Sequence, residues 1–159
     1  MPVQPRRQRL RTILTVTAAV LTALVLGGIV GGYVLYDRAT TPDRSAPEVV
    51  VDNYLRAFFV DRDETLADLF VCGDGASLAE LWTLREDLIA REARFAVPFF
   101  VSWESLAVQR EGDEAVAEVQ LVLVISAHVD GVSYSDPQPW RFTTRLGEDW
   151  RVCAGARVD

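Results

Sequence analysis

The sequence predicts an α+β domain that follows a membrane-spanning helix. The 25 residues Thr12–Tyr36 carry no charged side chain, and a helix of about 20 apolar residues is long enough to cross the hydrocarbon core of a bilayer. After this segment, apolar residues recur at helical spacing as far as Pro98 and alternate with a period of two beyond it. Helices followed by a run of neighbouring strands are typical of the α+β class.

The charge pattern predicts the orientation of the anchor. Four arginines lie between residues 6 and 11, and all 23 acidic residues follow the apolar segment. Because basic flanks stay on the cytoplasmic side, we expect residues 1–11 in the cytoplasm, residues 12–36 in the membrane and the rest outside it. A cleaved signal peptide is the alternative, but its apolar region is usually about 7–15 residues long and ends in a small-x-small site. Asp37–Pro42 offers no such site, so we expect an uncleaved, single-pass protein of the plasma membrane.

Composition limits the kinds of binding partner that are possible and indicates the kind of genome that encodes the chain. The part of the chain outside the membrane is strongly acidic, and such a surface repels nucleic acid and anionic lipid headgroups. All 16 basic residues are arginine, and Asn53 is the one asparagine. This avoidance of AT-rich codons is typical of a GC-rich bacterial genome, such as that of an actinobacterium.

The two cysteines, Cys72 and Cys153, both follow the anchor. An even pair in an oxidising compartment most simply forms one disulfide. A bridge that closes so long a loop contributes on the order of 4 kcal/mol to stability. A catalytic thiol is the alternative interpretation.

We expect residues 37–47 to form a short polar linker and residues 48–159 to form one domain. Three capping boxes predict three helices in the first half of this domain, ending near Val60, Cys72 and Ala96. The capping pairs are Ser45 with Glu48, Asp61 with Glu64, and Ser77 with Glu80.

The second half predicts a four-stranded antiparallel meander. The strands are expected at residues 99–110, 115–129, 140–146 and 150–153, with a loop over 130–139. In the second strand every odd position is apolar, whereas the even positions are polar at both ends and apolar in the middle. We therefore expect one face of this strand to be fully buried and the other to be buried only in its middle.

Two segments in this order resemble the nuclear transport factor 2-like superfamily. Val50–Phe59 resembles the opening helix of that family, with its Tyr-Leu-x-Ala stripe, and Trp150–Cys153 resembles its last strand. The resemblance implies a cone of three helices packed on a curved four-stranded antiparallel sheet. A membrane helix followed by such a domain is similar to actinobacterial membrane proteins associated with mammalian-cell-entry lipid importers. It is also similar to single-pass subunits of type IV secretion and conjugation machines.

The resemblance implies binding or assembly more often than catalysis. We expect a non-catalytic accessory or scaffold subunit of a bacterial cell-envelope assembly, linked to lipid import, with protein partners and no cofactor. A secretion or conjugation subunit is one alternative. A cone that binds a small apolar ligand, or acts on one as an enzyme, is the other.

Few residues suit metal binding or catalysis. His128 is the one histidine, so a single chain cannot assemble a zinc site of the His/Cys type. His128 with Asp130 is the best candidate for a general-base pair, with Tyr134 or Tyr54 as a hydrogen-bond donor. The alternative is that His128 is a partly exposed histidine at a strand end with no catalytic role. Asp61–Glu64 is acidic but lacks the spacing of a calcium loop, so no metal site is predicted.

Aromatic residues spread over the domain are the candidate lining of a pocket inside the cone, although the same side chains can simply form its core. The candidate pocket residues are Tyr54, Phe58, Trp82, Trp103, His128 and Trp140.

Glycines in the membrane segment form two overlapping small-xxx-small motifs. Such spacing lets two helix backbones approach closely in lipid, so a homodimer is a further hypothesis. The residues are Gly27, Gly28, Gly31 and Gly32.

Overall fold

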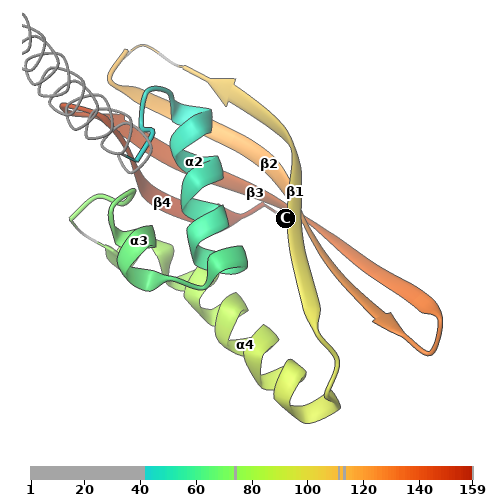
Figure 1. Ribbon diagram of the computed structural model, residues 1–159. Coiled ribbons are helices and arrows are strands. Elements are labelled where there is room, and N and C mark those ends of the chain that lie inside the picture. Colours follow the sequence, from blue (N-terminus) through green and yellow to red (C-terminus); the bar gives the residue numbers. More distant parts are fainter. Residues whose placement is uncertain (1–41, 74, 111, 113, 159) are drawn as a thin grey trace, which may run out of the picture. The chain divides into compact units, whose positions relative to one another are not determined.

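The computed structural model describes residues 42–158 except 74, 111 and 113. These residues form an α+β unit with three α-helices and one antiparallel sheet of strand order β1-β2-β3-β4 (Figure 1), which confirms the predicted class. The predicted cytoplasmic tail, membrane helix, glycine motifs and first part of the linker lie outside the described residues. Within the described ranges, no helix is both long and apolar enough to cross a membrane.

The helices occupy the first half of the domain, as expected. Helix α2 (Pro47–Leu55) continues into a π-helical turn, η1 (Arg56–Asp61), and is followed by the short helix α3 (Glu64–Asp68). A 3₁₀ turn, η2 (Gly75–Leu78), then leads into the long helix α4 (Ala79–Phe95). The first and third helical segments end within one residue of the predicted ends, whereas α3 ends at Asp68, four residues before Cys72.

The helix starts differ from the capping boxes that the sequence suggests. The prediction is wrong at Ser45 and Ser77, because α2 and α4 each have as N-cap the next residue, whose side chain makes no capping hydrogen bond. For α2, Pro47 in the first turn favours a helix that begins there, because its fixed φ suits a helix and the N–H that it lacks would have no partner in the first turn. For α3, the cap shifts from Asp61 to Asp63, whose carboxylate accepts a hydrogen bond from the backbone N–H of Leu66 at 3.0 Å.

The sheet is a simple antiparallel meander. Its strands are β1 (Phe99–Gln109), β2 (Val116–Val129), β3 (Val132–Leu146) and β4 (Trp150–Arg157). The odd positions of β2 from 117 to 127 are buried against the helices, as the alternation predicts. The even positions in the middle of β2 are only half-buried, because no described helix covers that face.

The predicted loop over residues 130–139 is wrong, because these residues turn tightly and begin β3. Asp130 and Gly131 have φ values of 52° and 81°, which suit the two-residue turn that fits the twist of a hairpin. Pro137 and Pro139 are unusual within a strand, because proline has no N–H to donate to a neighbouring strand. The Pro139 carbonyl accepts from Val158 N–H at 2.9 Å, on the β4 side of the strand. The nitrogens of both prolines therefore face away from β2, and no hydrogen bond to β2 is lost.

The disulfide joins the helical half of the domain to the sheet. Cys72 and Cys153 form the predicted bridge, with their Cα atoms 4.9 Å apart. Beside it, Cys72 N–H donates to Val152 O at 2.8 Å and Val152 N–H donates to Phe70 O at 2.9 Å. The chain after α3 is thus held against β4 by both the covalent bond and backbone hydrogen bonds.

Candidate functional site

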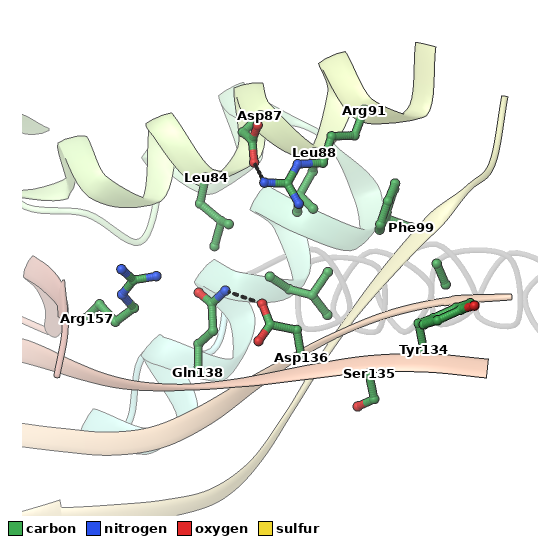
Figure 2. A pocket seen from close by; sticks show the side chains of 12 residues that line it. Leu84, Asp87, Leu88, Arg91, Phe99, Tyr134, Ser135, Asp136, Gln138 and Arg157 are labelled. Atoms are coloured by element: carbon green, nitrogen blue, oxygen red, sulfur yellow. Dashed lines mark hydrogen bonds and ion pairs between the residues drawn. The ribbon is translucent and has the colours of Figure 1, made fainter. Parts of the chain in front are cut away.

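A groove runs between α4 and the face of the sheet that carries the helices (Figure 2). Its helix side comes from residues spaced three and four apart on α4, which lie on one face of that helix. Its apolar floor comes from β1 and β2. This part of the groove encloses about 380 Å³. The helix residues are Leu84, Asp87, Leu88 and Arg91, and the floor residues are Phe99, Ile125 and Ala127.

A second cavity of about 480 Å³ lies beside the first, toward the start of α4. Ala79, Glu80, Thr83 and Trp140 line it but not the first cavity. The two cavities share four lining residues, so they form one continuous depression, here named the α4 groove. The shared residues are Leu84, Asp87, Gln138 and Arg157.

Glu92 fixes the far end of α4 against the sheet. Its carboxylate accepts two hydrogen bonds from the Arg62 guanidinium, at 2.7 and 2.9 Å, and one from the backbone N–H of Phe99 at 3.0 Å. The hydrogen bonds from Arg62 hold the pKa of Glu92 below its usual value, and they raise the pKa of Arg62. This network holds Phe99, which lines the groove at the start of β1, against the end of α4.

The acidic groups around the α4 groove all have partners. Asp87 forms an ion pair with Arg91 at 2.6 Å, and Asp136 accepts from the Gln138 side-chain amide at 2.8 Å. Glu80 accepts from the backbone N–H of Arg157 at 3.0 Å. In Figure 2 the side chains of Gln138 and Arg157 reach into the space between α4 and the sheet.

Three polar groups in the groove have no such partner. The Trp140 side chain is only 2 % exposed, and its Nε1–H has no acceptor among the described residues. The buried Oε1 of Gln138 likewise has no donor there. The Arg157 guanidinium makes no ion pair within the described part of the chain, although it is exposed.

The opposite face of the sheet carries an apolar area at its centre. Val122 and Val124 are half-buried on this face, and Phe100, which is 61 % exposed, pairs with Ser126 and so lies diagonally from Val124. In the β2–β3 register, Val122 pairs with Pro139 and Val124 pairs with Pro137. Phe100, the two valines and the two prolines are here named the outer patch. Glu118 and Arg141 form an ion pair at 3.6 Å further along the same two strands.

The structure does not bring the six predicted pocket residues together. Tyr54 and Phe58 stack with their ring centres 5.4 Å apart inside the core, and Trp82 meets Phe58 edge-on at 4.8 Å. Burial raises the pKa of the Tyr54 hydroxyl. Trp103 donates from Nε1 to the Asp52 carboxylate at 2.7 Å. Of the six, Trp140 lines the α4 groove.

His128 lies away from the groove. It is exposed on the outer face of β2, and its Nδ1 is 3.0 Å from Ser133 Oγ. Asp130, its suggested partner, lies in the tight turn of the hairpin. Across residues 42–158, apart from the three gaps, no three His, Cys, Asp or Glu side chains are placed to hold a metal ion.

The groove itself was missed by sequence reasoning. One signal was available in the sequence. Leu84, Asp87, Leu88 and Arg91 have helical spacing, so they form a row of apolar and charged side chains on α4. This row lies beside the apolar row that packs into the core. Its partner surface depends on the start of β3, which the sequence assigned to a loop.

The sequence was also compared with known proteins. No model of a protein family matches it, and no curated protein matches it. The functional interpretation therefore depends on the residues and on their geometry.

Proposed function

We propose that this protein is a single-pass, membrane-anchored accessory subunit of a bacterial cell-envelope assembly, linked to lipid import. Its domain would be a nuclear transport factor 2-like scaffold outside the cytoplasmic membrane. The uncharged segment 12–36 with its arginine flank supports the anchor and the orientation. The Cys72–Cys153 disulfide supports an oxidising compartment.

The outer patch is the observation that carries the assembly role. Large apolar areas on a protein surface mark sites of interaction, whereas single exposed apolar side chains do not. Here Val122 and Val124 lie directly opposite Pro139 and Pro137, Phe100 on β1 lies diagonally from Val124, and no described helix covers them. Charged groups border this area: Glu104 on β1 stands opposite Val122, and the Glu118–Arg141 ion pair lies further along β2 and β3. An apolar area with a charged border has the layout of a protein interface. Another subunit of the assembly would cover it.

The arrangement of ionisable groups favours binding over catalysis. A general base must lie within hydrogen-bond reach of its substrate. In the α4 groove, the carboxylates of Asp87 and Asp136 are already engaged by neighbouring side chains. His128, which would be the usual base, lies on the other face of the sheet.

Affinity purification of the full-length protein from its native membrane, in mild detergent, tests this proposal. We expect a stoichiometric set of permease subunits to be recovered with it. Phe100→Ser should reduce that recovery at least about tenfold, because a buried phenylalanine contributes roughly 1.5–3 kcal/mol.

Phe95→Ser is the matched control. Phe95 is 59 % exposed, almost as much as Phe100, but it lies at the end of α4. Its replacement should leave the recovery unchanged. Recovery of the wild-type protein alone, or equal losses in the two variants, would contradict the proposal. Channel and pilus-type subunits in place of a permease would point to a secretion machine.

A further inference from the structure

The two edge strands of the sheet differ in how they are covered. β4 forms one edge, and the chain after α3 lies against it. The backbone of Val152 bonds there to Cys72 N–H at 2.8 Å and to Phe70 O at 2.9 Å, beside the disulfide. β1 forms the other edge (Figure 1), and no backbone among the described residues bonds to its outer side.

The outer side of β1 carries the backbone groups of the odd residues at its start. In an antiparallel pair, successive residues direct their N–H and C=O groups alternately toward and away from the neighbouring strand. Phe100 O accepts from Ser126 Oγ, a side chain of β2, at 3.4 Å. Phe99 N–H donates instead to a carboxylate of α4 at 3.0 Å. The alternation therefore directs the N–H and C=O groups of Val101 and Trp103 away from β2.

The pairing of β2 with β3 leads to the same assignment. Pro139 O accepts from Val158 N–H, so the backbone groups of Pro139 face β4 and not β2. Val122, opposite Pro139 on β2, therefore directs its backbone groups to β1. Its partner on β1 is Glu104, an even residue. The even residues of β1 thus bond to β2, and the outward groups of the odd residues have no backbone partner within the described chain.

The start of β1 lacks the features that usually protect an edge strand. Natural edge strands carry charged residues, proline or a bulge, which prevent pairing with another chain. Phe99–Trp103 contains no charged residue and no proline. The bulge comes only after Glu104, where the register with β2 shifts and Ser105 has a φ of 61°. Phe99–Trp103 is therefore an open edge that favours pairing with a further strand.

The side chains beside the open edge indicate the strand that would pair with it. A row of outward N–H and C=O groups is matched by another extended backbone. Phe100 belongs to the outer patch, so a strand added beside β1 would continue that patch. Glu104 is exposed and has no ion pair within the described chain. Its charge favours a basic residue on the added strand.

We propose that an extended segment of the partner subunit adds to the sheet beside Phe99–Trp103, with an apolar side chain next to Phe100 and a basic side chain next to Glu104. This inference rests on the proposed function, since the same subunit would cover the outer patch. It adds the mode of binding, in which backbone hydrogen bonds supply affinity and the flanking side chains select the segment.

Hydrogen exchange at single amides tests the inference on the wild-type, full-length protein in mild detergent. One sample is purified with its partner subunit, and the other is overproduced and purified alone. The amides of Val101 and Trp103 should exchange at least about tenfold more slowly with the partner bound, because exchange then requires their hydrogen bonds to open. The amides of Ser102 and Glu104, which bond to β2, are the internal control and should be protected in both samples.

Two results of this experiment would overturn the inference. One is equal exchange of the Val101 and Trp103 amides in the two samples. The other is protection of these amides in the protein alone, because the chain itself or a second copy would then cover the edge.

Val101→Pro tests the same pairing through the recovery of permease subunits. Proline is tolerated where the N–H of an edge strand faces outward, so the β1–β2 ladder should remain intact. Recovery should fall at least about fivefold, because a carbonyl of the partner would lose its donor. Val101→Thr is the matched control, since it keeps both the N–H and the branched shape, and it should recover the subunits like the wild type. Urea unfolding of both variants verifies that the domain is folded.

The outcomes separate this inference from the proposed function. Loss of the subunits in Phe100→Ser but not in Val101→Pro would mean that the partner covers the outer patch without pairing with β1. That result overturns the inference and leaves the proposed function standing. Recovery of no subunit by the wild type overturns both. Loss in a folded Val101→Pro variant, with protected amides in the wild-type assembly, supports both.

Discussion

Glu92 shows how one side chain fixes the geometry of the candidate site. Three hydrogen bonds converge on its carboxylate, two from Arg62 after the π-helical turn and one from the start of β1. Glu92 thus ties the last turns of α4 both to the preceding helical segment and to the sheet. Without it, the wall and the floor of the α4 groove would lose their common anchor.

The lowered pKa of Glu92 predicts how its contribution to the stability of the domain depends on pH. A carboxyl group whose folded pKa lies below its unfolded value of 4.5 stabilises the protein above that value. This contribution is lost as the pH falls through the lowered folded pKa. Glu92→Gln should therefore cost on the order of 1 kcal/mol at neutral pH and progressively less below about pH 4.

Tryptophan fluorescence during urea unfolding measures this directly, because all four tryptophans follow residue 80 and report on the domain. Glu86→Gln is the control, since Glu86 is exposed on the same helix. A stability difference for Glu92→Gln that is the same at pH 3 and at pH 7 would contradict the argument.

At the scale of elements, periodicity predicted most of the fold. The apolar spacing around Tyr54 and Leu81 located α2 and α4, and the alternation from Ala117 to Ala127 located β2 and its buried face. These patterns succeed because each element buries one face against the same core. The antiparallel order of the strands followed from their short connections.

The predictions that failed depend on how neighbouring elements pack together, which the pattern of a single element does not show. The start of β3 was missed because Pro137 and Pro139 are harmless only on the side of the strand that faces away from β2. The α4 groove was missed with it, since Gln138 and its neighbours form one wall. Of the aromatic residues considered for a pocket, Tyr54, Phe58 and Trp140 belong to the buried core, which is the alternative that the sequence left open.

The disulfide makes a prediction at the same scale. Cys72 and Cys153 are 81 positions apart, and their bridge restricts the unfolded chain over that whole loop. Replacing both cysteines by serine should lower the free energy of unfolding by on the order of 4 kcal/mol. Reducing agent should destabilise the wild type and leave the double variant unaffected. Intact mass should show no alkylated thiol in protein taken from the membrane, and two alkylated cysteines would refute the bridge.

At the scale of the whole domain, the two faces of one sheet differ in what covers them. The face with the helices holds the core and the α4 groove, whereas the other face exposes the outer patch. The sequence had anticipated this second face, since Val122 and Val124 are apolar in an otherwise polar series. The structure leaves both valines half-buried. A partner subunit on the outer patch would complete the burial that the strand pattern indicates.

The most direct test of this account is photo-crosslinking in living cells. The full-length protein would carry p-benzoylphenylalanine in place of Phe100 or, as the control, in place of Phe95. The account predicts one discrete crosslinked product of higher mass from position 100, containing a different membrane subunit, and none from position 95. No product from position 100, or a product made only of a second copy of this chain, would contradict the claim that the outer patch binds another subunit.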